Sequence, residues 1–244
     1  MRVGAGVNLP PVLAVSVIFR ARENQARTKG QRPMNFWQFF LQNRDQIFSA
    51  TLEHLGLVGA AMLIAVLIGV PAGILVTRRK WLEKPIIGLA NVAETIPSLA
   101  LLGFLLPVPW LGERAGRLAI AALALYALLP IIRNTATGIE GVDPSVREAA
   151  RGMGMTDAQI LIKVELPLAF SYLLAGIRVA TVLTIGIATI AAAVGAGGLG
   201  EFIFRGLAMV NNQLILAGAI PAALLALIAD YLLGALEKRF SYAR

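Results

Sequence analysis

The run Leu55–Thr77 constrains the fold of this chain more than any other segment. It holds 23 residues without a charged side chain and is followed directly by Arg78, Arg79 and Lys80. A helix needs roughly 20 apolar residues to cross a hydrocarbon core of about 30 Å. In lipid, its backbone hydrogen bonds must all be made within the protein. The run therefore predicts a transmembrane helix that ends in a cationic anchor.

Further apolar segments predict an all-α membrane protein with about five transmembrane helices. They are Ile86–Pro107, Leu118–Ile132, Leu168–Val194 and Leu214–Leu236. The third span, Leu118–Ile132, is short, so we expect it to extend at one end or to cross where the bilayer is thin. Only 15% of the residues are charged, against about 25% in soluble domains.

The residue inventory excludes several classes of chemistry. The chain has no cysteine, which excludes disulfides, cysteine catalysis and cysteine-held metal sites, and no metal ligands are predicted. Its one histidine, His54, is the only possible base of a Ser-His-Asp site, which argues against such a hydrolase. Because His54 comes directly before the first apolar run, we expect it at the membrane interface.

Positive charge in the short loops predicts the orientation. The segments 78–84, 133–163 and 238–244 together hold 11 Lys and Arg residues, whereas the opposite side holds four from residue 34 onward. Cytoplasmic loops carry the excess of Lys and Arg. We therefore expect an extracytoplasmic segment 34–54, a transmembrane domain 55–240 and a cytoplasmic C-terminus.

The N-terminal residues 1–33 do not fit this orientation. They hold six basic residues and one acid, which is five of the net charge of +8. The rest of the chain is not strongly basic, so no nucleic-acid partner is predicted. The topology would place this basic segment outside, so we expect Met34 to be the start and 1–33 to be an extension that is not translated. A genuine basic tail is the alternative.

The longest polar stretch between spans, 134–167, predicts a cytoplasmic helix–turn–helix. Asp143 and Pro144 are typical of the N-cap and first position of a helix over about 144–153. Gly154 is typical of a left-handed helix end. Such a compact projection suits the docking of a soluble partner, although an ordered surface loop would have the same caps.

The second helix of this loop has its own start signal. Thr156 followed by Gln159 predicts a capping box. Leu166 and Pro167 are expected to interrupt the helix before the next span, since proline lacks the N–H that a helix interior needs.

Within this loop, the pattern of small, acidic and proline residues resembles the EAA motif of binding-protein-dependent ABC importer permeases. The matching positions are Glu148, Ala149, Ala150, Gly154, Val164, Leu166 and Pro167, and only the valine departs from the usual isoleucine. The stretches Glu94–Ser98, Gly141–Pro144 and Gly195–Gly200 are similar to the glycine betaine/carnitine/choline subfamily. The resemblance covers about residues 35–240.

This resemblance implies the type I ABC importer permease fold in the bacterial cytoplasmic (inner) membrane, with an osmoprotectant such as glycine betaine, choline or carnitine as substrate. Its implied partners are an ABC ATPase that docks on the EAA loop, a second permease subunit and an extracytoplasmic substrate-binding protein. ATP and Mg²⁺ are expected on the ATPase and no cofactor on this chain, which lacks a G-x-x-x-x-G-K-[ST] motif. The alternatives are a permease for another small solute, such as the amino acid methionine, and a membrane anchor or assembly protein that does not transport.

Polar residues inside the second span predict a lining of the translocation path. Asn91, Glu94 and Ser98 have helical spacing that would place them on one face, and Pro97 is expected to bend the helix. An intramembrane carboxylate is costly and is functional by default. The alternative is a structural hydrogen-bond network between helices that includes Arg178.

Other features are expected to be structural. Arg178 is expected to reach the cytoplasmic interface, and Asp230 to pair with a loop cation or cap a partner helix. The string Gly195-x-Gly197-x-x-Gly200 lacks the strand and the acid of a dinucleotide site. It predicts a tight turn on the outer side.

Overall fold

The computed structural model describes residues 35–241, and the regular elements in this part of the chain are all helices. The chain divides into two units, 1–44 and 45–244. In the first unit the described helix is α2 (Phe36–Gln42), which begins with a capping box between Asn35 and Gln38. The extension 1–33 and the expected start at Met34 lie outside the described residues.

Four helical segments of the second unit are long and apolar enough to cross a membrane. They are α3 (Arg44–Arg78), α6 (Ala115–Glu140), the continuous run Asp157–Val194, which contains α9 (Leu166–Ala191), and α11 (Asn212–Ser241). Each contains one of the predicted apolar segments. The short third span is extended at both ends, because polar residues continue α6 on either side of its apolar centre. Likewise α3 begins at Arg44, eleven residues before the apolar run, so part of the segment 34–54 belongs to this helix.

The predicted span Ile86–Pro107 is present as two helices, and the bend predicted at Pro97 is confirmed. It is α4 (Lys80–Thr95) followed by α5 (Ser98–Leu105), which meet at an angle of 105°. Ile96 and Pro97 between them are extended, because a proline disfavours the helical conformation of the residue before it. The Tyr126 hydroxyl of α6 donates a hydrogen bond to the carbonyl of Ile96, which satisfies one acceptor freed by the break.

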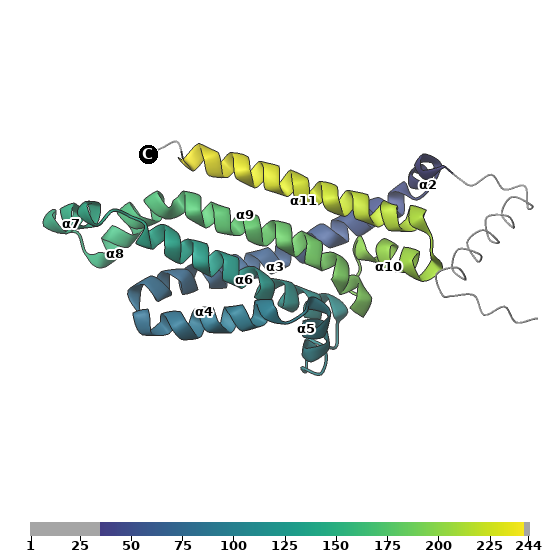
Figure 1. Cartoon of the computed structure of the whole chain (residues 1–244), viewed down its shortest axis with the longest axis horizontal. Coiled ribbons are helices and arrows are strands. Elements are labelled where there is room, and N and C mark those ends of the chain that lie inside the picture. The colour runs from purple at the N-terminus through teal and green to yellow at the C-terminus, as the bar shows by residue number, and fades with distance from the viewer. Residues whose placement is uncertain (1–34, 242–244) are drawn as a thin grey trace, which may run out of the picture. The chain divides into compact units, whose positions relative to one another are not determined.

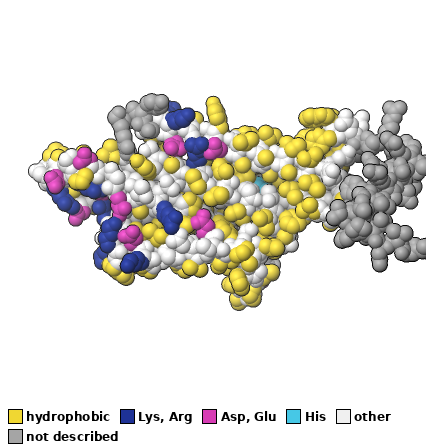
Figure 2. All heavy atoms as spheres, viewed as in Figure 1, with side chains coloured by type: hydrophobic (Ala, Val, Ile, Leu, Met, Phe, Trp, Pro, Cys, Tyr) yellow, Lys and Arg dark blue, Asp and Glu magenta, His cyan; other side chains and the backbone are white. Residues whose placement is uncertain are grey.

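The helices of the second unit alternate in direction (Figure 1). The α3–α4 turn, the short helices α7 (Pro144–Gly152) and α8 (Asp157–Ile160), and the end of α11 lie at one end, whereas α5 and α10 (Gly200–Met209) lie at the other. Helix α9 packs between α6 and α11, and α4 packs against α6. Figure 2 shows that Lys, Arg, Asp and Glu side chains gather at the α7–α8 end. The three basic segments of the sequence therefore share one end.

Small residues allow α3 to approach α6 closely. A Cβ atom on Gly73 would lie 2.6 Å from the Cβ atom of Thr135, and one on Gly69 would lie 2.8 Å from Cγ2 of Ile131. This agrees with the packing expected of small residues spaced one turn apart in lipid. The Gly69–Gly73 face of α3 therefore has no room for a side chain.

Replacement of Gly73 by alanine is expected to destabilise the protein by about 1–3 kcal/mol, because overpacking forces neighbouring atoms to shift. Gly59→Ala on the same helix is the matched control, since nothing lies within 4 Å of a Cβ at that position. Thermal unfolding in detergent micelles measures both. Equal unfolding temperatures for the two variants would contradict the close contact.

Candidate functional site

The loop between α6 and α9 has the predicted first helix. Asp143 is the N-cap of α7, where its carboxylate accepts a hydrogen bond of 2.8 Å from the backbone N–H of Ser145, and Pro144 follows at the first position. This hydrogen bond holds the pKa of Asp143 below its usual value. Gly154 ends the helix with φ +79°, which confirms the left-handed ending.

The second helix, α8, also begins as predicted. The backbone N–H of Thr156 donates to the Gln159 side chain at 2.9 Å, and the Gln159 N–H donates to the Thr156 hydroxyl at 3.4 Å. Together these two bonds form the capping box.

The expected interruption at Leu166 and Pro167 does not occur. Helix α8 passes through a π-helical turn, η1 (Leu161–Glu165), directly into α9. The N–H of Leu166 donates to the carbonyl of Leu161, five residues back. This register shift brings Pro167 into the first turn of α9, where its missing N–H is tolerated. The loop is therefore continuous with the α9 span.

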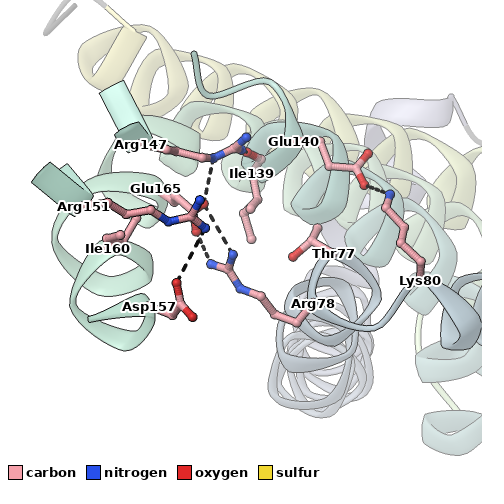
Figure 3. Close-up of a pocket in the computed structure, with 10 residues that line it drawn as sticks. All are labelled: Thr77, Arg78, Lys80, Ile139, Glu140, Arg147, Arg151, Asp157, Ile160 and Glu165. Atoms are coloured by element: carbon pink, nitrogen blue, oxygen red, sulfur yellow. Dashed lines mark hydrogen bonds and ion pairs between the residues drawn. The ribbon is translucent and has the colours of Figure 1, made fainter. Parts of the chain in front are cut away.

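Glu165 of the π turn is the centre of a buried ionic cluster. Its side chain is 1% exposed and accepts hydrogen bonds from Nε of Arg147 at 2.8 Å and from both Nη atoms of Arg78. Arg147 also donates to the carbonyl of Ile139. The cluster thus joins the end of α3, the end of α6, helix α7 and the π turn (Figure 3).

The sequence interpretation missed all three charged members of this cluster. Arg78 and Arg147 were counted only as loop charges, and Glu165 lay at a variable position of the EAA pattern. The signal that was present is a lone carboxylate among apolar residues directly before a span, at Val164-Glu165-Leu166. A carboxylate in such a place requires cationic partners.

A cavity of about 340 Å³ lies against this cluster. Its lining comes from α3, α4, α6, α7, α8 and the π turn: Thr77, Arg78, Lys80, Ile139, Glu140, Arg147, Arg151, Asp157, Ile160 and Glu165. Two more ion pairs stand at its exposed rim, Lys80–Glu140 and Arg151–Asp157. The Glu165 cluster and buried apolar residues such as Ile139 and Ile160 therefore hold the base of the α7–α8 projection together.

The EAA residues divide between the inside and the outside of the loop. Ala150 is buried, whereas Glu148 and Ala149 are exposed. Val146 and Ala149 lie on one face of α7, Met153 follows at its C-cap, and all three are exposed, Met153 at 75%. Helix α7 therefore presents an apolar stripe with Glu148 beside it. Further along, Val164 and Leu166 are half-buried and Pro167 is exposed.

The polar residues predicted to line the path are split by the break in the span. Asn91 and Glu94 share a face of α4, but Pro97 and Ser98 follow the bend, so the single face predicted for all of them is wrong for Ser98. The amide oxygen of Asn91 accepts a hydrogen bond of 2.9 Å from Nη2 of Arg133 in α6. Glu94 is exposed and has no ion-pair partner among residues 35–241.

Arg178 forms no network with Asn91 and Glu94, and its side chain does not extend toward the interface without a partner. Its guanidinium binds Asp230 of α11 through two hydrogen bonds of 2.6 and 2.9 Å, and Glu237 through one of 3.2 Å. Asp230 therefore pairs with a cation of the neighbouring span and not with a loop cation. The two carboxylates lie seven residues apart, on one face of α11.

His54 is fully buried within the bundle, and its position at the membrane interface stays a prediction. Its Nε2 atom lies 3.1 Å from the carbonyl oxygen of Ile185, because α3 begins well before His54 and carries it inside the bundle.

The glycine string forms the tight turn that was predicted. Gly195, Gly197 and Gly198 all have positive φ, and the Gly198 N–H donates to Oε2 of Glu53 at 3.2 Å. No group of three or more His, Cys, Asp or Glu residues could hold a metal ion within residues 35–241.

Comparisons with known proteins agree with this geometry. Residues 48–242 match the family described as "Binding-protein-dependent transport system inner membrane component". The chain is 44% identical over 203 residues to the carnitine transport permease protein OpuCB of Listeria monocytogenes, covering 83% of this chain and 92% of that protein. It is 41% identical over 207 residues to the glycine betaine/carnitine/choline transport system permease protein OpuCB of Bacillus subtilis, covering 84% and 94%. A solved structure of the inward-facing MetNI methionine ABC transporter superposes with a TM-score of 0.72 at 24% identity, over 80% of this chain and 95% of that one.

Proposed function

This chain belongs to the family of inner-membrane components of binding-protein-dependent transport systems, and from this premise we propose that it is the permease subunit of an ABC importer for osmoprotectants. The observation that carries the proposal is 41–44% identity, over more than four fifths of the chain, to permeases named for carnitine, glycine betaine and choline. The chain is a multi-pass inner-membrane protein, and its family does not hydrolyse ATP itself. An ATPase and a substrate-binding protein are its partners.

The alternatives have weaker support. The methionine transporter shares the fold at 24% identity, which is a likeness of architecture alone. The family match covers the whole transmembrane domain, and a protein that only anchored a partner would not require this entire fold.

The orientation follows from the distribution of charge. The α3–α4 turn, the α7–α8 loop and the end of α11 lie at the same end of the helices, where charged side chains gather (Figure 2). Since cytoplasmic loops are enriched in Lys and Arg, this end and the C-terminus face the cytoplasm. The α7–α8 loop is then on the side where ATP is available.

Helix α7 is the element that docks on the ATPase. Its exposed stripe of Val146, Ala149 and Met153 offers apolar area to a partner, and Glu148 beside it offers charge. Behind this face, Arg147 holds Glu165 and Ile139. When the ATPase displaces α7, the buried cluster therefore moves α3, α6 and α9 with it, because α7 is not joined to them by a flexible linker alone.

The translocation path runs past Asn91 and Glu94, between this chain and a second permease subunit. Asn91 and Glu94 are eleven and fourteen residues after Lys80, which places them about 16 and 21 Å from the cytoplasmic end of α4 and inside a bilayer core of about 30 Å. An exposed charge at that depth faces an aqueous cavity and not lipid. The adjacent C-terminal end of α4 carries partial negative charge, which favours a cationic group.

Replacement of Glu94 by glutamine is expected to lower the uptake of all three osmoprotectants by about tenfold or more, because each carries a trimethylammonium group that loses its counter-charge. Uptake is measured with radiolabelled glycine betaine, carnitine and choline in cells that lack the native chain. Glu83→Gln is the control, since Glu83 lies in the first turn of α4. Full transport by an assembled Glu94→Gln importer would remove Glu94 from the path.

A further inference from the structure

We propose that Arg133 and Glu94 form a two-charge site for zwitterionic osmoprotectants, in which Arg133 receives the carboxylate and Glu94 the trimethylammonium group. This inference rests on the proposed function and adds Arg133 as a residue that discriminates between substrates. The ligand class is a small solute with one carboxylate and one quaternary ammonium.

The two charges lie on the same face without neutralising each other. Asn91 and Glu94 are one turn apart on α4, with Cβ atoms about 5–6 Å apart for such spacing. Arg133 of α6 reaches this face, since its Nη2 atom donates to Asn91. Among residues 35–241, Arg133 and Glu94 form no ion pair with each other, and both side chains are exposed. The amide of Asn91 thus holds the guanidinium in place without neutralising it.

Arg133 of α6 differs from Arg178 of α9 in its partners. Arg178 is bound by two carboxylates of α11. Among residues 35–241, Arg133 donates a hydrogen bond of 2.9 Å to the neutral amide of Asn91 and forms no ion pair with a carboxylate. The sequence places Arg133 at the start of the cytoplasmic loop, but α6 continues for seven residues beyond it, about 10 Å along the helix, so Arg133 belongs to the span. An unneutralised arginine at that depth is costly unless it meets water or an anionic ligand.

The chemistry of the guanidinium suits a carboxylate. Its planar N–H groups bind the two carboxylate oxygens in parallel, and the bond to Asn91 uses only one of its nitrogens. Glycine betaine and carnitine carry a carboxylate, whereas choline carries a hydroxyl group in its place. Arg133 should therefore matter for the first two solutes and not for choline, while Glu94 should matter for all three.

The test uses the whole importer, with its ATPase and binding protein, in proteoliposomes. Arg133→Gln is expected to lower uptake of glycine betaine and carnitine about tenfold or more relative to choline, and Arg133→Lys to retain more of it. Lys84→Gln, which removes an exposed cation near the start of α4, is the control. Affinities of the isolated binding protein for each solute are measured in parallel. The ratio of zwitterion uptake to choline uptake, corrected for these affinities, then reports on the permease.

A second variant tests the same site with the arginine left in place. Asn91→Asp puts a carboxylate against Arg133, which should strengthen the α4–α6 contact and yet lower zwitterion uptake relative to choline, because the new ion pair competes with the substrate. A residue with a merely structural role would not respond in this way. Unchanged uptake by Asn91→Asp would overturn the proposal.

The remaining outcomes separate this inference from the proposed function. If the native importer carries none of the three solutes, the osmoprotectant assignment fails. If it carries them and Arg133→Gln lowers choline uptake equally, or lowers none, only the two-charge site fails. Native transport of choline alone would also overturn the site. For an importer that carries only zwitterions, equal uptake by Arg133→Gln and Arg133→Lys would overturn it.

Discussion

An importer with Glu165 replaced by glutamine is expected to lose at least about nine tenths of its solute uptake and to unfold at a lower temperature. Glu165 is buried and accepts hydrogen bonds from both Arg78 and Arg147. Removing one member of a buried ionic cluster costs about 3–5 kcal/mol, because the remaining charges lose their partner. Arg78 is partly exposed, so the lower end of that range is expected. Loss of the cluster would also release α7 from α3 and α6.

The control lies in the same loop. Arg151 and Asp157 form an ion pair of 3.7 Å with both side chains largely exposed, and such pairs contribute about 0–1 kcal/mol. Asp157→Asn should therefore keep native uptake and unfolding temperature. Thermal unfolding of the assembled complex and solute uptake in proteoliposomes are measured for both variants. Native values for Glu165→Gln would show that the cluster does not hold the loop.

Replacement of Glu148 by arginine is expected to abolish uptake and to leave the stability of the isolated chain unchanged. The Glu148 side chain is exposed, and the hydrogen bonds and ion pairs of residues 35–241 do not include it. Exposed substitutions usually change the free energy of unfolding by less than about 0.5 kcal/mol. At an interface, however, reversal of a charge costs several kcal/mol, which is a loss of about a hundredfold or more in partner affinity.

Co-purification of the ATPase subunit measures this effect directly. Glu201→Arg is the matched control, since Glu201 is also an exposed acid and lies in α10, at the opposite end of the helices. The Glu148→Arg chain should insert and unfold as the native chain does, yet recover little ATPase. Normal ATPase recovery together with normal uptake would exclude Glu148 from the docking face.

The two variants are expected to separate the inner and outer faces of the same loop. Glu165→Gln should lower both stability and uptake, since it acts within the chain. Glu148→Arg should lower uptake alone, since it acts on a partner. If both variants changed stability and uptake in the same way, the loop would not have the separate inner and outer faces that its exposure pattern indicates.

Local signals in the sequence were sufficient for much of the site. The caps at Asp143 and Thr156, and the left-handed end at Gly154, depend on residues within a few positions of one another. For this reason the first loop helix and the start of the second were predicted correctly. The spans were predicted because crossing a bilayer requires a long apolar run whatever its neighbours are.

Whether a helix continues past a proline was harder to predict: the bend expected at Pro97 occurs, whereas the interruption expected at Pro167 does not. Pro97 and Pro167 both follow apolar residues and both remove a backbone donor. At Pro97 the helix breaks by 105°, with Tyr126 satisfying a freed carbonyl. At Pro167 a π turn carries the helix through. The choice depends on which neighbouring group can satisfy the backbone, and that group comes from elsewhere in the chain.

The sequence by itself determined the fold class, the spans and the caps of the loop between α6 and α9, because each of these depends on composition or on residues close together in the chain. The tertiary structure decided which charges meet. Glu165 lies 87 residues from Arg78, and Arg178 lies 52 residues from Asp230. Arg133 reaches Asn91 across 42 residues. Such pairs depend on how helices are placed side by side, and a charged residue carries no local sign of the partner that will neutralise it.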